Sequence, residues 1–140
     1  MPLTQETGPE ALWRALREAR VPLLELDRAR VPVTPGILAL YRDTRVAWFG
    51  KSANLRGTIA HAFAHEGPSA KSPLRRSVST YLGLTTLEAL AFGRYRLTPD
   101  DHVRISGWIR ECSVAWHECA SEADVVRLET RLLAEPDRER

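Results

Sequence analysis

The sequence predicts an α+β fold in which a small three-stranded antiparallel sheet is flanked by about five helices. Two short apolar segments, 37–41 and 46–49, are separated by the polar tetrapeptide Arg-Asp-Thr-Arg, which is the pattern of a β-hairpin. A third segment, 113–119, alternates its side chains with the period of two that a strand requires. Several other segments begin at residues that favour helix starts. We therefore expect one sheet with helices packed around it.

The chain has 140 residues, of which 44% are hydrophobic, and it can bury about one core, because domains commonly run to about 100–150 residues. We expect a single domain over 1–140. It comprises an N-terminal helix and extended connection (1–32), a core that carries the motifs (33–65), and flanking helices with the third strand (66–140). No run of about 18 apolar residues is present, and the N-terminus lacks the apolar stretch of a signal peptide. We therefore expect a cytoplasmic protein without membrane contact.

The N-terminal segment holds one helix and a proline-rich connection. Thr7, followed by Gly-Pro-Glu, forms a capping-box pattern, so we expect a helix over about 8–20. Its apolar stripe consists of Leu12, Trp13, Leu16 and Ala19. Residues 21–36 contain three prolines and end in glycine, which predicts an extended connection.

The hairpin leads into a helix with one apolar face. Gly50 is expected to end the second strand, and Ser52 or Asn54 can cap a helix that runs to about Ala64. Apolar residues at every fourth position mark its inner face, namely Leu55, Ile59 and Phe63. That spacing turns Arg56 and His61 outward or to the flank.

The C-terminal half holds further helices. A Ser-Pro pair opens one through Leu82, with Leu74, Val78 and either Tyr81 or Leu82 pointing inward. Residues 85–96 are compatible with helix or strand. A Thr-Pro-Asp-Asp start predicts a helix to about Arg110, and Ser121 is expected to cap a last helix to about Ala134.

The formal net charge of +2 is unevenly distributed along the chain. Residues 42–76 carry seven basic and two acidic residues, a net charge of +5, whereas residues 77–140 carry eight basic and eleven acidic residues, a net charge of −3. A basic field of that size attracts polyanions by releasing their counterions, although solvated arginines also serve solubility alone. The candidate nucleic-acid-binding residues are Arg42, Arg45, Lys51, Arg56, Lys71, Arg75 and Arg76.

One acidic residue of the last helix needs a physical explanation. Glu129 lies on or beside the apolar stripe of the last helix, where an ionised carboxylate costs several kcal/mol unless it is paired or holds a metal. A salt bridge to an arginine, a place at the edge of the stripe, and metal ligation all remain open.

Cys112 and Cys119 have neither a zinc-ribbon spacing nor a disulfide framework, so we interpret them as buried or idle thiols.

The motifs of the hairpin resemble those of the GIY-YIG nuclease superfamily. The resemblance rests on Pro-Gly-Ile-Leu-x-x-Tyr at 35–41, Val-Ala-Trp-Phe-Gly-Lys-Ser-x-Asn-Leu at 46–55, and Glu129 on a late helix. The resemblance covers residues 33–65. A looser similarity continues to the C-terminus, and there the chain resembles small uncharacterised bacterial members of the family. The resemblance implies a three-stranded sheet with flanking helices that cleaves DNA with a single metal ion. In that family a glutamate binds Mg²⁺ or Mn²⁺, tyrosines help to activate water, and an arginine steadies the phosphate.

The chain departs from this pattern at three catalytic positions. The tyrosines of the two motifs fall on Leu38 and Trp48, neither of which can accept a proton from water. The arginine falls on Thr58, which offers one hydroxyl in place of a five-donor cation. The residues that still match the family are Gly50, Lys51, His61 and the metal-type Glu129, and Tyr41 is a displaced stand-in on the opposite strand face.

Three hypotheses follow. The first is a DNA-binding domain with a degenerate active site and impaired cleavage, which would need no metal. The second is an active endonuclease in which His61 or Tyr41 serves as the base around a Mg²⁺ or Mn²⁺ ion on Glu129, with Lys51 as a further catalytic candidate. The third is a protein-interaction module in which Trp48 and Phe49 line the former active-site groove.

Overall fold

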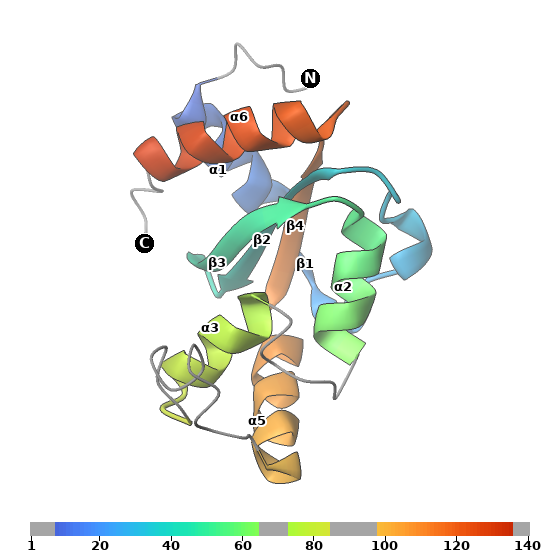
Figure 1. Cartoon of the computed structure of the whole chain (residues 1–140), viewed down its shortest axis with the longest axis vertical. Coiled ribbons are helices and arrows are strands. Elements are labelled where there is room, and N and C mark those ends of the chain that lie inside the picture. The colour runs from blue at the N-terminus through green and yellow to red at the C-terminus, as the bar shows by residue number, and fades with distance from the viewer. Residues whose placement is uncertain (1–7, 65–72, 85–97, 136–140) are drawn as a thin grey trace. The chain divides into compact units, whose positions relative to one another are not determined.

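The computed structural model describes residues 8–64, 73–84 and 98–135, apart from the side chains of 61–64 and 73 (Figure 1). The chain divides into two units, one formed by Met1–Thr58 with Cys112–Arg140 and the other by Ile59–Glu111. Helix α2 (Leu55–Ala64) begins in the first unit and continues into the second. None of the helices in the described ranges is long and apolar enough to cross a bilayer. The single domain over 1–140 stays a prediction.

A four-stranded antiparallel sheet, in the order β1-β4-β2-β3, forms the centre of the first unit. The predicted hairpin is confirmed as β2 (Gly36–Arg42) and β3 (Arg45–Ser52). Asp43 adopts a φ of 57° in its two-residue turn, a conformation that asparagine and aspartate tolerate better than most residues. The predicted end of the second strand at Gly50 is wrong, because pairing with β2 continues to Ser52.

The predicted third strand is confirmed as β4 (Ser113–Glu118), but the sheet has four strands where we expected three. The additional strand, β1 (Val21–Pro22), pairs with β4 at one edge. A proline is tolerated at such an edge, because its missing N–H group is not needed in the ladder. Two short 3₁₀ turns follow it, η1 (Leu23–Glu25) and η2 (Arg28–Arg30).

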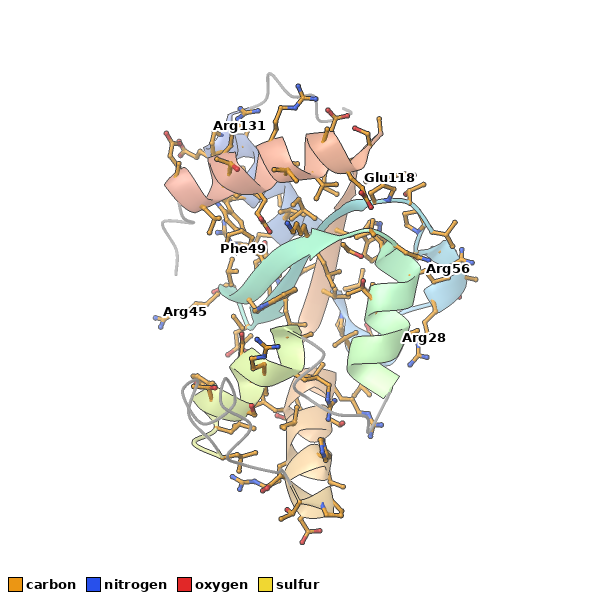
Figure 2. All side chains as sticks on the ribbon, in the orientation of Figure 1. Arg28, Arg45, Phe49, Arg56, Glu118 and Arg131 are labelled. Carbon is orange, nitrogen blue, oxygen red and sulfur yellow. The ribbon has the colours of Figure 1, made fainter. Side chains whose placement is uncertain are left out.

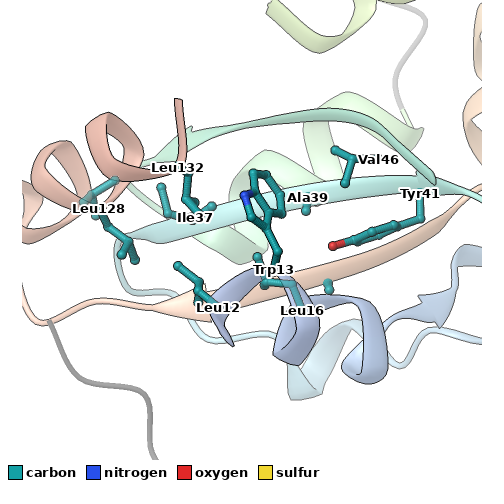
Figure 3. Close-up of a cluster of buried hydrophobic side chains, with 11 residues drawn as sticks. Leu12, Trp13, Leu16, Ile37, Ala39, Tyr41, Val46, Leu128 and Leu132 are labelled. Atoms are coloured by element: carbon teal, nitrogen blue, oxygen red, sulfur yellow. The ribbon is translucent and has the colours of Figure 1, made fainter. Parts of the chain in front are cut away.

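Helices α1 (Pro9–Ala19) and α6 (Glu122–Ala134) cover one face of the sheet (Figures 1 and 3). The buried cluster on this face comprises Leu12, Trp13, Leu16, Ile37, Ala39, Tyr41, Val46, Ala115, Val125, Leu128 and Leu132. The Trp13 ring meets Phe49 edge-on at 4.9 Å, and its Nε1 donates to the Glu135 carbonyl at 2.8 Å. The predicted helix is thus confirmed, although Gly8 rather than Thr7 is its N-cap residue and Thr7 lies outside the described residues.

The opposite face carries the other alternate residues of each strand. Leu38 and Leu40 of β2 are fully buried there, and in register with them lie Trp48 of β3 and Trp116 of β4. Leu55, at the start of α2, approaches this face closely, since its Cδ1 would lie 2.8 Å from a Cβ at position 36. The two faces of β3 therefore differ, with Trp48 on one and Phe49 on the other.

The second unit pairs α3 (Pro73–Tyr81) with α5 (Pro99–Arg110). The predicted capping of α5 is confirmed, with Thr98 and Asp101 bonding each other's backbone N–H groups. Leu74 and Val78 are buried as expected, whereas Tyr81 is 74% exposed and stacks at a tilt on Trp108. Residues 85–96, for which helix and strand were both open, lie outside the described residues.

Candidate functional site

The two motif glycines lie where other atoms of the chain approach their backbone closely. A Cβ at Gly36 would collide with the carbonyl oxygen of His117 on β4. A Cβ at Gly50 would lie 2.7 Å from two atoms of the Trp48 indole, so the ring lies against the backbone of that glycine. Both contacts are shorter than real Cβ contacts, and any larger residue would displace the neighbour. The motif glycines therefore have a packing role in this chain.

The two positions of the family tyrosines lie on the same face of the hairpin. Leu38 is 1% exposed and pairs with Gly50 and with Trp116. Trp48 is half-buried and pairs with Leu40, two residues along the same face. An aliphatic side chain and an indole form an apolar surface there, and neither supplies a group that can take a proton.

At the position of the family arginine, the Thr58 hydroxyl is hydrogen-bonded to the Ser52 hydroxyl. Thr58 Oγ1 lies 2.6 Å from Ser52 Oγ, and Ser52 Oγ also accepts from the Asn54 N–H at 3.2 Å. The pattern predicts Ser52 or Asn54 as the cap of α2, and Asn54 takes this place by accepting from the Gly57 N–H at 2.9 Å. Sequence reasoning missed the Ser52 to Thr58 contact, because nothing in their spacing of six residues indicates it.

The N-terminus of α2 offers no donor to an anion. Its first N–H groups donate to the carbonyls of Thr34 and Pro32, to the side chain of Asn54 and then to the Asn54 carbonyl. A helix start binds phosphate through unsatisfied N–H groups, and here they are all used within the chain. A phosphate on this surface therefore depends on side chains.

Glu129 and Lys51 come together at the outer edge of β3. The Glu129 carboxylate accepts from the backbone N–H of Lys51 at 3.1 Å. Glu129 is half-buried beside the buried residues Val125, Leu128 and Leu132 of α6, as its position in the stripe predicts. Of the alternatives left open by the sequence, a place at the edge of the stripe is therefore observed, with a backbone partner in place of an arginine.

An open groove of about 310 Å³ lies between this end of β3 and α6. We call it the β3–α6 groove, and it is lined by Lys51, Ser52, Ala53, Glu122, Val125 and Val126. Among the described residues, no three His, Cys, Asp or Glu side chains lie close enough to share a metal ion. A single half-buried carboxylate beside an open groove nevertheless fits Mg²⁺, which keeps several waters and uses one or two carboxylates with substrate phosphates. Glu129 therefore fits a single-carboxylate site.

Of two further catalytic candidates, Tyr41 is buried and His61 stays a prediction. Tyr41 is fully buried in the cluster beneath α1, so its hydroxyl has no contact with bulk solvent, and we no longer propose it as the base. The backbone of His61 lies in α2, and its side chain is outside the described residues.

Trp48 and Phe49 lie on opposite faces of β3, so they do not line one groove. The hypothesis of a protein-interaction module therefore loses its support.

The candidate nucleic-acid-binding residues of the first unit do not form one patch. Arg45, Lys51, Arg56 and Arg76 are exposed, and Arg42 is half-buried. Arg45 and Ser52 are separated by the length of β3, about 23 Å at about 3.3 Å per residue, so Arg45 and Arg56 lie toward opposite ends of the strand (Figure 2). Lys71 lies outside the described residues.

The prediction that Arg75 lies on the basic surface is wrong. Its side chain is 2% exposed, and it donates to Ser106 Oγ at 3.0 Å and to the His102 carbonyl at 3.3 Å. It therefore joins α3 to α5 inside the second unit. The expectation arose because charged side chains are usually solvated, whereas a guanidinium with several donors can be buried when backbone and hydroxyl acceptors meet it.

Cys112 and Cys119 flank β4, and His117 lies within it. Cys112 is buried and Cys119 half-buried, both in the reduced form. Burial, together with Asp124 and Glu118, raises the pKa of the Cys119 thiol, which disfavours the reactive thiolate. Burial lowers the pKa of His117 below 6.5, and the nearby Glu118 opposes this shift. These observations agree with thiols that have no catalytic or metal-binding role.

Comparison with known proteins connects these features. A family model described as the GIY-YIG catalytic domain matches residues 25–138. No curated protein and no solved structure gives a match. The matched range includes the hairpin, α2, β4 and α6, and it leaves out α1 and β1. On the hairpin motifs, the sheet and this match, the chain belongs to the GIY-YIG nuclease superfamily.

Proposed function

We propose that this chain is a DNA-binding domain of the GIY-YIG superfamily whose active site is degenerate and whose cleavage is impaired. The observation that carries the proposal is the hydroxyl pair of Thr58 and Ser52, which lies where the family has its phosphate-binding arginine. A threonine hydroxyl already engaged at 2.6 Å has little capacity to bind a phosphate oxygen as well.

The two tyrosine positions support the same conclusion. Leu38 is closed off inside the sheet and Trp48 packs on Gly50, so neither position offers a phenol to a water molecule. Loss of a general acid or base commonly reduces a rate by about 10²–10⁴, and loss of a preorganised electrostatic donor by about 10²–10³. Three such losses in one site leave little of a nuclease rate.

DNA remains the partner that the charge distribution favours. Arg45, Lys51, Arg56 and Arg76 are exposed, and the segment that carries them has a net charge of +5. Contacts of this type bind the phosphate backbone without reading its sequence. A divalent ion would be held by Glu129, next to Lys51 of the β3–α6 groove, where it would neutralise charge on a bound phosphate.

Binding of a short labelled duplex at two salt concentrations tests the DNA half of the proposal. We expect affinity to fall steeply between 50 and 200 mM salt, as it does when several phosphates are neutralised. A branched duplex of the same length, measured in parallel, reports any preference for DNA structure. No salt-sensitive binding at micromolar protein would remove DNA as the partner.

One observation favours the alternative of an active nuclease. Glu129 and Lys51, two of the residues that still match the family, meet at 3.1 Å beside an open groove. In that alternative His61 takes the role of the base, because Tyr41 is buried. The alternative requires divalent-dependent nicking that Glu129→Gln abolishes. Glu122→Gln is the matched control, since Glu122 is a carboxylate of the same helix that lines the β3–α6 groove without contacting the Lys51 N–H group.

A further inference from the structure

We infer that Arg28, Arg30 and Arg56 form a phosphate-binding surface, on the η2 turn and the first turn of α2. This inference rests on the proposed DNA binding and adds to Arg56 two residues, Arg28 and Arg30, that lie outside the basic segment 42–76. Arg28 and Arg30 belong to the first 41 residues, where five basic and five acidic residues balance, so net charge gives no sign of them. The fold brings them beside Arg56.

Arg56 joins the two segments. Its Nε donates to the Val31 carbonyl at 2.7 Å, and one Nη donates to the Ala29 carbonyl at 3.0 Å. The backbone N–H of Arg56 donates to the Pro32 carbonyl at 3.0 Å. Since Ala29 lies between Arg28 and Arg30, these bonds bring Arg56 next to the turn that carries both, and Figure 2 shows Arg28 and Arg56 on the same side of the first unit. A guanidinium has five N–H donors, and the two side-chain bonds of Arg56 leave three for a ligand.

The turn itself is held by local hydrogen bonds. Asp27 caps it by accepting from the Ala29 N–H at 3.0 Å, and the Arg30 and Val31 N–H groups close the 3₁₀ bonds. Val31, the residue after the turn, is fully buried and anchors it. Arg28 and Arg30 therefore belong to a hydrogen-bonded turn with a buried neighbour, so the cost of binding would fall mainly on ordering their side chains.

The charges are available to an external anion. Arg28, Arg30 and Arg56 are all exposed, and Arg30 is within 3.9 Å of Asp27 in a solvent-exposed pair. An exposed pair of this kind contributes little and exchanges readily for a stronger partner. Among the described residues, Asp27 is the sole carboxylate within ion-pair distance of these three side chains. Arginine forks bind phosphate oxygens in pairs, so the surface suits the backbone of a nucleic acid.

The salt dependence of DNA binding tests this inference. The double variant Arg28→Ala with Arg30→Ala removes two exposed side chains and leaves the Arg56 bonds in place. If each contacts a phosphate, the slope of log affinity against log salt becomes shallower by about 0.9 for each, about 1.8 in total. Between 50 and 200 mM salt, wild-type affinity then falls about tenfold more than that of the variant. The loss should be equal for two unrelated duplex sequences, because backbone contacts read no bases.

The matched control removes the same charge from other helices of the same unit. Arg14→Ala with Arg127→Ala deletes two side chains that are each 63% exposed and pair with Glu10 and Asp124 on their own helices. We expect this control to keep the wild-type slope. A wild-type protein without salt-sensitive binding overturns the proposed function and this inference with it. Salt-sensitive wild-type binding with equal slopes for the two double variants overturns the inference alone.

Discussion

Thr58 Oγ1 and Ser52 Oγ lie 2.6 Å apart, so that the first turn of α2 bonds back to the end of β3. The family pattern calls for an arginine at position 58, whose long side chain would extend toward a phosphate. In this chain the position instead closes the junction between strand and helix. The loss of one functional group and the gain of a local structural contact therefore occur at the same residue.

Restoring the family residues should restore cleavage only when all three are replaced. We expect the triple variant Leu38→Tyr, Trp48→Tyr and Thr58→Arg to raise divalent-dependent nicking by about 10² or more, since each group supplies a separate part of the chemistry. Thr58→Arg alone should give no measurable rise. Leu38 is buried, so the larger tyrosine will destabilise the fold by about 1–3 kcal/mol, and folding must be checked by thermal melting.

The same triple variant carrying Glu129→Gln is the control, and it should stay inactive. A triple variant that folds, binds DNA and still does not nick would show that these three positions are not the reason for impaired cleavage.

Gly50 and Trp48 should be energetically coupled. Gly50→Ala places a Cβ 2.7 Å from the indole, and displacing the ring should destabilise the protein by about 1–3 kcal/mol. In a Trp48→Ala background the same change should be nearly neutral, because the atoms that it meets are gone. Denaturant unfolding of the four proteins of this cycle gives the coupling directly. Equal effects of Gly50→Ala in both backgrounds would contradict the packing described.

Arg75 and Arg76 are neighbours in sequence, but only the replacement of Arg75 by alanine should lower the free energy of unfolding. Arg75→Ala removes charged hydrogen bonds to Ser106 and His102, and it should lower the free energy of unfolding by about 1.5–3 kcal/mol without changing the salt slope of DNA binding. Arg76→Ala, at an exposed position, should change stability by less than about 0.5 kcal/mol. A shallower salt slope in Arg75→Ala, with stability retained, would return Arg75 to the binding surface.

His117 should make stability depend on pH below neutrality. Burial lowers its pKa in the folded state below the unfolded value of 6.5, so the unfolded chain binds the proton more readily. Stability is therefore full above pH 6.5 and declines as the pH falls through 6.5 toward the folded pKa. Urea unfolding between pH 5 and 8 should show a smaller decline for His117→Gln than for wild type. Parallel curves for the two proteins would exclude His117 as the source.

Much of the fold was predictable because its signals are local. The hairpin follows from two β-rich segments around a polar turn, and the caps at Asn54, Thr98 and Ser121 mark helix starts that the structure confirms. Strand β1 was not predictable, because its two residues pair only through contact with β4, about 90 positions away. Arg75 escaped prediction for the same reason, since its acceptors come from another helix.

The candidate site was predictable in its residue types and not in its contacts. The motif spacing identifies positions 38, 48 and 58 and the acid at 129, but it does not reveal that Thr58 bonds to Ser52 or that Glu129 bonds to the Lys51 backbone. The grouping of Arg28 and Arg30 with Arg56 depends on carbonyl groups as acceptors, and these carry no sequence signature. Charge summed along the chain therefore marked the segment 42–76 as basic and missed Arg28 and Arg30.

The central claim is that the chain binds DNA with little remaining cleavage, and one rate ratio tests it most directly. The measurement is the nicking rate of a duplex fully bound by protein in saturating Mn²⁺, for wild type relative to Glu129→Gln. We predict a ratio within about twofold of one, because no efficient metal-dependent step remains to be lost. A ratio of about 10² or more, with Glu122→Gln equal to wild type, would contradict the account and establish an active nuclease.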